Sequence, residues 1–177
     1  MQKVYPPVIV VDENDHEIGT AMVAEVWQKG LYHRIASVFV LDDAGRMLLQ
    51  LRSTDAKMHP ECWDQAAGGH VDAGQTYDQT AENELAEELG LTDVKLEPLG
   101  TFRTNETLDD GRIINQFERV YLATVPQNTK LNPDAEEVKT VQWFNRSELK
   151  TLIAEHPEKF TSGLRQALRN FMPDFIR

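Results

Sequence analysis

A glycine-containing loop that runs into an acidic helix, Gly68–Leu91, constrains this chain more than any other stretch. The helix should begin within Thr76–Asp78, because Thr and Asp side-chain oxygens accept the amide protons of a first helical turn. It should end at Gly90, since glycine suits a left-handed C-terminal cap. A four-residue repeat predicts an apolar stripe that packs against a sheet. The stripe consists of Ala81, Leu85 and Leu89.

Three carboxylates on this helix stand at i, i+3 and i+4, which places Glu84, Glu87 and Glu88 on one helical face. Like charges at these spacings disfavour a helix by roughly 0.2 to 0.5 kcal/mol per pair, and no Lys or Arg lies between Lys57 and Lys95 to offset them. Three explanations stay open: a basic group from a distant strand, a water-facing acidic surface, or a bound metal cation. Magnesium, a hard ion that prefers oxygen ligands, suits the third explanation.

Glycines precede the acidic helix, where they let the backbone approach a ligand closely. Together with the carboxylates, this segment resembles the Nudix box, Gly-x5-Glu-x7-Arg-Glu-apolar-x-Glu-Glu-x-Gly-apolar. Seven of the nine fixed positions match. The matching residues are Gly69, Glu84, Leu85, Glu87, Glu88, Gly90 and Leu91.

The two mismatched positions are occupied by Gln75 and Asn83. The resemblance assigns these positions to a Glu–Arg salt bridge that helps to hold the catalytic helix. Two neutral amides can hydrogen-bond to each other in place of the salt bridge. Because both charged partners are replaced, no charged side chain is left unpaired. Their presence also motivates an alternative in which the domain is catalytically weakened and binds a phosphorylated ligand as a sensor.

The resemblance implies that Glu84, Glu87 and Glu88 hold Mg²⁺, with Mn²⁺ as an alternative, together with a backbone carbonyl of Gly68 or Gly69. The catalytic base is then Glu87 or Glu88, or else Glu118 from outside the box. An acid on a pleated strand also suits a water-facing position, so both interpretations of Glu118 stay open.

A closer resemblance, over roughly residues 5–170, is to the branch of the Nudix family related to isopentenyl-diphosphate isomerase. It is carried by HRIASVFVLDDAGRMLLQLRS, MHPECWDQAAGGHV and VQWFNRSEL. Gly68 stands at the position of the isomerase's catalytic cysteine, and glycine has no titratable group for proton transfer at carbon. The isomerase's Glu pair corresponds to Ile114 and Gln116. An isomerase function is therefore the less favoured alternative.

Three residues outside the box are candidate substrate-binding residues. Arg52 and Lys57 stand where related isomerases hold basic residues that contact a diphosphate, although a plain surface cation is an equal alternative for each. His70, like His33, falls at the place of an isomerase histidine, and a structural hydrogen-bonding role is its alternative.

The remaining elements predict a single α/β domain over residues 1–177, with an N-terminal strand and helix extension in 1–30 and the core and C-terminal helices in 31–177. The resemblance implies an α/β/α sandwich around a mixed sheet. Residues 54–69 are expected to form a loop, and loops at 104–112 and 126–137 are expected to select the substrate. Strands are expected at 8–11, 96–103, 113–125 and 138–144, with a hairpin over 35–53. Further helices are expected at about 22–30, 146–155 and 162–171.

Net charge and composition limit the partners of this chain. A formal net charge of -11 argues against a nucleic acid polymer as partner, whereas a small diphosphate escorted by magnesium is compatible with it. One cysteine, no signal-like N-terminus and no long apolar stretch predict a cytoplasmic protein without a membrane partner, as a monomer or homodimer. We therefore expect a Mg²⁺-dependent hydrolase that cleaves a diphosphate linkage in a small metabolite, such as a nucleoside diphosphate linked to another moiety.

Overall fold

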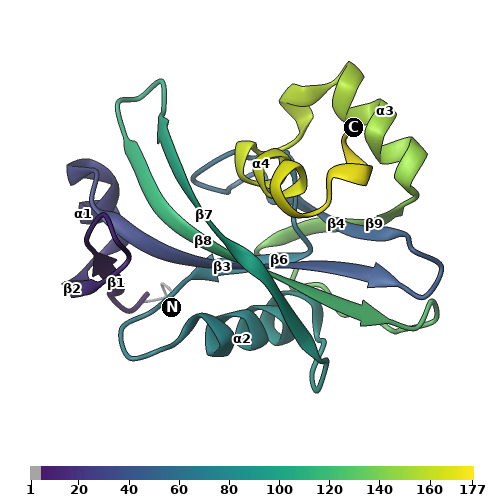
Figure 1. Ribbon diagram of the computed structural model, residues 1–177, viewed down its shortest axis with the longest axis horizontal. Helices are drawn as coiled ribbons and strands as arrows, with labels where there is room; N and C mark the ends of the chain where they lie inside the picture. Colours follow the sequence, from purple (N-terminus) through teal and green to yellow (C-terminus); the bar gives the residue numbers. More distant parts are fainter. Residues whose placement is uncertain (1–4) are drawn as a thin grey trace.

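The computed structural model describes residues 5–177, so the first four residues of the expected N-terminal extension lie outside the described part. Within it, nine strands form one mixed sheet. Figure 1 shows helix α2 on one face of this sheet and helices α3 and α4 on the other. This arrangement confirms the predicted α/β architecture with a mixed central sheet.

Strand β3 (Tyr32–Asp42) is the centre of the sheet. Strand β8 (Ile113–Val125) runs parallel to it from Tyr32↔Asn115 to Asp42↔Val125. The other edge of β3 is shared in succession by three antiparallel strands. These are β1 (Val8–Val11), β6 (Ala67–His70) and β4 (Met47–Arg52).

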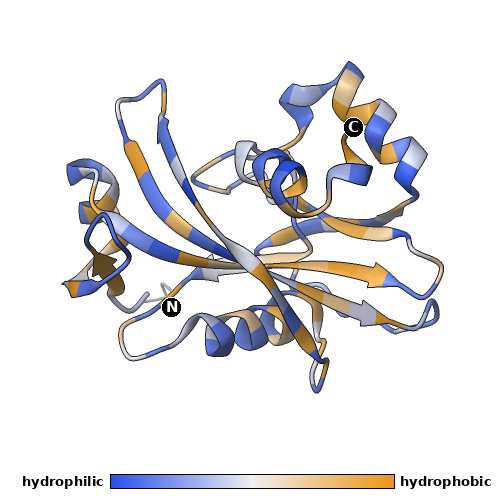
Figure 2. Ribbon diagram, in the orientation of Figure 1, coloured by the Kyte–Doolittle hydropathy of each residue, from blue (hydrophilic) through white to orange (hydrophobic). Residues whose placement is uncertain are grey.

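The remaining strands extend the sheet on either side. β2 (Glu17–Ala21) pairs with β1, and β7 (Leu96–Thr107) pairs with β8. β5 (Trp63–Asp64) and β9 (Val138–Phe144) both pair with β4. Apolar residues concentrate in the strands, as the hydrophobic colouring of the C-terminal half of β3 shows (Figure 2). One buried cluster lies under α2 and a second lies under α3 and α4.

The helices begin and end where local capping signals place them. Helix α2 (Tyr77–Leu89) starts with a capping box between Thr76 and Gln79 and ends at Gly90, whose φ is 68°. Helix α1 (Val23–Lys29) ends at Gly30 with φ 63°. Helices α3 (Arg146–Glu155) and α4 (Ser162–Phe171) have the predicted bounds and are capped by the side chains of Asn145 and Thr161. Two short 3₁₀ helices follow them, η1 (Pro157–Lys159) and η2 (Pro173–Phe175). No helix within residues 5–177 has the length and apolar character needed to cross a membrane.

Two of the expected loops are wrong in part. Residues 54–69 include β5 and most of β6, because pairing with β3 makes a strand of Ala67, Gly68 and Gly69 despite their low intrinsic strand propensity. Residues 104–107 extend β7, since they pair with Ile113–Gln116 of β8. The connection between these two strands is therefore only residues 108–112, shorter than the predicted substrate loop.

The expected hydrogen bond between Gln75 and Asn83 does not form within the described residues. The Gln75 side-chain oxygen accepts a hydrogen bond from the Thr80 hydroxyl instead, at 2.8 Å, and Asn83 is exposed. The start of α2 is held by other contacts. The Tyr121 hydroxyl on β8 donates to the Asp78 carboxylate in the first turn of the helix.

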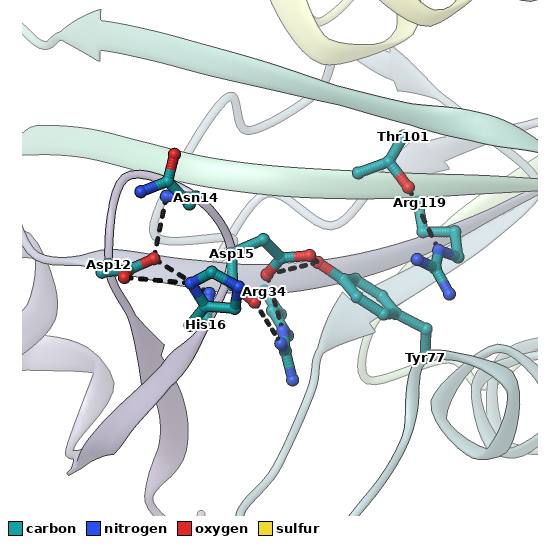
Figure 3. A network of polar contacts seen from close by, with 8 residues as sticks. All are labelled: Asp12, Asn14, Asp15, His16, Arg34, Tyr77, Thr101 and Arg119. Atoms are coloured by element: carbon teal, nitrogen blue, oxygen red, sulfur yellow. Dashed lines mark hydrogen bonds and ion pairs between the residues drawn. The ribbon is translucent and has the colours of Figure 1, made fainter.

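Asp15, in the turn between β1 and β2, holds the first residue of α2 (Figure 3). Its carboxylate accepts a hydrogen bond from the Tyr77 hydroxyl at 3.1 Å and from Arg34 Nε at 2.7 Å. The Tyr77 ring also lies within cation–π distance of two guanidinium groups, those of Arg34 at 5.3 Å and Arg119 at 4.3 Å from the ring centroid. We call these four residues the Asp15 clamp.

The Asp15 clamp predicts the effect of Asp15→Asn. The variant should lower the free energy of unfolding by about 1 to 2 kcal/mol, because it removes the carboxylate that pairs with the largely buried Arg34. Chemical denaturation measures the change. The matched control is Glu13→Gln, an exposed acid of the same turn, which should leave stability unchanged. Equal stability of both variants and the wild type would contradict the clamp.

Candidate functional site

The three box glutamates on α2 have three different environments. The buried stripe of Ala81, Leu85 and Leu89 fixes the rotation of the helix against the sheet. This rotation leaves Glu87 exposed and Glu84 half-buried, and it turns Glu88 into the protein, where it is 6% exposed. Glu87 is therefore the outermost of the three carboxylates, Glu84 is intermediate and Glu88 is the innermost.

Glu88 is a buried acid with excess negative charge around it. One carboxylate oxygen accepts a hydrogen bond from Gln50 Nε2 on β4 at 2.8 Å. Burial raises the pKa of Glu88 well above its usual value, and the charges of Glu84 and Glu137 raise it further. The Gln50 hydrogen bond and the charge of Arg52 act in the opposite direction without restoring it. A cation at this position would relieve both the burial cost and the repulsion.

Glu84 lies directly against the glycine loop. A Cβ atom built on Gly69 would collide with both carboxylate oxygens of Glu84, so only glycine leaves room for this carboxylate. Gly69 is held in β6 opposite Ala36 of β3. The structure thus brings together the loop glycine and the helix glutamate that the sequence indicated as metal ligands.

The charge of Glu87 affects the pKa of Asp72, an acid in the segment before α2. Burial raises the pKa of Asp72, and the negative charge of Glu87 raises it further. Among residues 5–177, however, no three Asp, Glu, His or Cys side chains converge as a ready metal-ligand set. The acids act on one another electrostatically, Glu84 and Glu137 on Glu88, and Glu87 on Asp72. The donor chemistry nevertheless fits a hard dication, because every donor is a carboxylate or backbone oxygen and because burial and neighbouring acids disfavour the ionised form of Glu88.

Glu118 lies on the opposite face of the sheet from Glu84. Its carboxylate is 2% exposed and accepts hydrogen bonds from the Ser37 hydroxyl at 2.6 Å and from Gln65 Nε2 at 2.7 Å. Ser37 follows Ala36 on β3 and so points away from α2, toward α4. The structure therefore gives neither a water-facing Glu118 nor one that joins the box glutamates.

Burial raises the pKa of Glu118 to about 7, with a further contribution from the charge of Asp64. Asp64 also accepts a hydrogen bond from Arg52 Nη1 at 3.2 Å and one from the Thr161 hydroxyl at 2.7 Å. Asp64 therefore pairs with Arg52 and also acts electrostatically on Glu118.

The two predicted substrate-binding cations have different positions. Arg52 lies on β4 two residues after Gln50, and its charge lowers the pKa of both Glu88 and His70. Its Nε donates to the Met58 carbonyl at 3.1 Å, which together with Asp64 fixes its direction. Lys57 is exposed, and its ammonium lies 5.9 Å from the Tyr5 ring centroid. Arg52, rather than Lys57, is placed to meet a phosphate near Glu88.

His70 is packed among aromatic rings. It stacks on His33 with 5.2 Å between ring centroids, and Trp27 lies 5.9 Å away. Burial lowers the pKa of His70 to about 3 and that of His33 to about 4, so both rings are neutral at physiological pH. The packing favours a structural role for His70 over the predicted contact with substrate.

Three residues of this site were not predicted from the sequence: Gln50, Asp72 and Glu137. Gln50 had a recognisable signal, because it is a polar residue within the apolar run of β4. Asp72 and Glu137 had none, since they lie in segments that contain several polar residues and only folding brings them toward α2.

Comparison with known proteins agrees with this geometry. The family model described as NUDIX domain matches residues 31–171. The chain belongs to the Nudix family. Members of this family act in general on small-molecule diphosphates and use divalent metal ions.

Similar curated proteins and solved structures extend over most of this Nudix chain. An isopentenyl-diphosphate Delta-isomerase of Nocardia farcinica is 33% identical over 164 residues, 92% of each chain. Isopentenyl-diphosphate Delta-isomerase 2 of Photorhabdus laumondii is 31% identical over 153 residues, 86% of this chain and 85% of the relative.

Two solved structures have a similar fold, and the second of them is a NUDIX hydrolase by name. DR0079 of Deinococcus radiodurans has a TM-score of 0.76 at 20% identity, covering 92% of this chain and 97% of that one. A MutT NUDIX hydrolase of Burkholderia pseudomallei has a TM-score of 0.62 at 23% identity, covering 78% of this chain and 97% of that one.

The buried Glu118 predicts a pH dependence of stability. Its folded-state pKa of about 7 exceeds the ordinary 4.5, so the folded state keeps a proton that the unfolded chain releases. Its contribution to the free energy of unfolding is therefore fully present below pH 4.5 and is lost as pH rises to 7, by on the order of 3 kcal/mol.

Denaturation at a series of pH values measures this effect in Glu118→Gln. The variant should show a flatter decline in stability than the wild type between pH 4.5 and 7, because the amide carries no titrating proton. Glu136→Gln, an exposed acid, should keep the wild-type profile. The same slope in Glu118→Gln and the wild type would contradict the raised pKa.

Proposed function

We propose that this Nudix protein is a Mg²⁺-dependent hydrolase that cleaves a diphosphate linkage in a small phosphorylated metabolite, such as a nucleoside diphosphate linked to another moiety. The observation that carries the proposal is the buried Glu88 carboxylate, whose pKa is raised first by burial and then by the charges of Glu84 and Glu137. Carboxylates with strongly raised pKa values are concentrated at functional sites, and a bound cation would stabilise the ionised form of Glu88.

In this proposal Glu84, Glu87 and Glu88 hold the metal together with the backbone carbonyl of Gly69. When bound, Mg²⁺ neutralises phosphate charge and lowers the pKa of a water molecule, and Mn²⁺ can substitute for it. Glu87 or Glu88 takes the proton from the attacking water. Arg52, held by Asp64 and the Met58 carbonyl, directs its guanidinium toward the phosphate.

Glu118 fits this scheme less well than the box glutamates. Its carboxylate is enclosed by Ser37 and Gln65 on the other face of the sheet, and a Cβ on Gly163 of α4 would lie 3.5 Å from it. We therefore assign the catalytic base to α2, and give Glu118 a role in the interior under α4.

The names of the similar curated proteins favour isomerisation as the second candidate function. Three positions of this chain argue against it. Gly68 stands where the isomerase resemblance requires cysteine, and a Cβ there would meet the Ala36 carbonyl at 3.0 Å and Ser37 Cβ at 3.2 Å. Ile114 and Gln116 replace the isomerase glutamates, so the His33 and His70 pair lacks the carboxylates that would complete a metal site.

The sensor alternative rested on the missing salt bridge between positions 75 and 83. The Asp15 clamp and the Tyr121–Asp78 hydrogen bond hold the start of α2 without that bridge. These contacts support a helix that stays positioned for catalysis, so a sensor without turnover is less favoured.

The proposal predicts the effect of Glu88→Gln and Glu87→Gln. Each variant should lose more than about 100-fold of Mg²⁺-dependent turnover, since a neutral amide neither holds the metal tightly nor accepts a proton from water. Glu88→Gln should unfold no more easily than the wild type at neutral pH, because it removes a buried carboxylate. Full turnover in both variants would exclude the assignment.

The assay is a panel of nucleoside diphosphates linked to sugars, cofactors or alcohols, with isopentenyl diphosphate as a separate arm. Glu82→Gln, an exposed acid on the same helix, is the matched control and should keep full turnover. Isomerised isopentenyl diphosphate without hydrolysis of any other compound would support the second candidate function. Tight Mg²⁺-dependent binding without any product would support the sensor.

The contact between Gly69 and Glu84 predicts the effect of Gly69→Ala. The added methyl group would push the Glu84 carboxylate from its position, and a displacement of about 1 Å can cost about 100-fold in rate. The loss should appear in turnover and in metal affinity more than in stability, because the added methyl group meets the far end of a flexible side chain and no backbone atom. Gly19→Ala, with open space around its Cβ, is the control. Unchanged turnover in Gly69→Ala would remove Glu84 from the metal site.

A further inference from the structure

The C-terminal part of the chain differs from the rest in charge. Before residue 145 the sequence has twelve Lys and Arg against 25 Asp and Glu, whereas residues 145–177 have six against four. This segment forms α3, η1, α4 and η2, which Figure 1 shows together on one face of the sheet. The C-terminal segment of this acidic protein therefore has a small excess of basic residues, and it lies on the face of the sheet opposite α2.

Two adjoining cavities open in this region. The smaller one, of about 310 Å³, has Arg165 and Arg169 of α4 together with Arg177 around an apolar floor. The floor consists of Ile153, Ala154, Pro157 and Ile176. The larger one, of about 620 Å³, shares Arg177 and adds Arg146 and Lys150. Five of the six basic residues after position 145 thus line the two cavities.

Within residues 5–177, no Asp or Glu side chain lines the smaller cavity beside its three arginines. Asp174 is the one acidic residue that lines either cavity in the described part of the chain, and it pairs with Arg146 at 3.5 Å. Arg165 and Arg169 are one helical turn apart, so their like charges repel. Nε of Arg165 is buried without a hydrogen-bond partner among the described residues. A buried donor without a partner is costly unless a ligand or water satisfies it.

We propose that the smaller cavity is a binding site for an organic phosphate. Guanidinium groups present donors in a fork that matches phosphate oxygens, which an ammonium group cannot reproduce. Arg165 and Arg169 hold the phosphate, Arg177 adds a third positive charge, and the apolar floor contacts the organic part of the ligand. Binding needs no divalent cation, because arginine supplies all the charge. The site is separate from the acidic face of α2 and does not depend on the hydrolase proposal.

Calorimetric titration of the full chain with phenyl phosphate, in EDTA, tests the site. The wild type should bind, and the double variant Arg165→Ala, Arg169→Ala should bind about tenfold more weakly or worse, because two charge-assisted contacts are lost. Arg165→Lys should lose part of the affinity, since it keeps the charge without the fork. Lys159→Ala, a charge loss in the same segment outside both cavities, should bind like the wild type.

Further measurements separate this site from the candidate active site. Arg52→Ala and Glu88→Gln should leave the affinity for phenyl phosphate unchanged, and inorganic phosphate should bind more weakly because it cannot use the apolar floor. Circular dichroism checks that each variant is folded. The proposal is overturned if phenyl phosphate does not bind at about 1 mM, the weak end of specific affinities. It is equally overturned if the double arginine variant keeps wild-type affinity or if Arg52→Ala abolishes binding.

Discussion

The pairing of β3 on both of its edges is the constraint on which the rest of the structure depends. β8 occupies one edge over the full length of the strand, while β1, β6 and β4 share the other. Because side chains alternate between the faces of a sheet, this register sends Ala36 and Gly69 toward α2 and Ser37 toward α4. A shift of one residue would exchange the two faces and separate Gly69 from Glu84. The chemistry of the box therefore depends on the register of a strand outside it.

The register also places the two buried acids, Glu88 and Glu118, on opposite faces of the sheet, where their surroundings differ. Glu88 lies where α2 meets β4, in a neighbourhood of further carboxylates, so its ionised form is costly until a cation arrives. Glu118 lies on the other face among neutral donors, Ser37 and Gln65, and titrates near neutral pH. The first arrangement suits metal binding. The second suits a carboxyl group that is protonated or ionised within the physiological range.

Much of the fold could be predicted from the sequence because its signals are local. The caps at Thr76, Asn145 and Thr161, and the glycines that end α1 and α2, fix the helix limits through contacts a few residues apart. β5, β6 and the extension of β7 were missed because they exist only through pairing with distant strands. The intrinsic strand propensity of their residues gives little information about such segments.

The candidate site also contains both contacts that a local motif indicates and contacts between residues far apart in the sequence. The contact of Glu84 with Gly69 agrees with the ligand set that the box motif indicated, since both residues belong to it. Asp15 and Tyr77 are 62 residues apart, and no local pattern connects them. Gln50, Asp72 and Glu137 likewise become neighbours of the glutamates only in the folded protein.

The position of Asp15 has a consequence for how this domain is delimited. The segment that matches the family begins at residue 31, yet the carboxylate that holds the first residue of α2 comes from the hairpin before it. A protein engineer who trimmed the chain to the matched segment would keep all the box glutamates and lose part of their scaffold. In this protein the peripheral hairpin is part of the scaffold that holds the box helix, so the structural unit is larger than the matched segment.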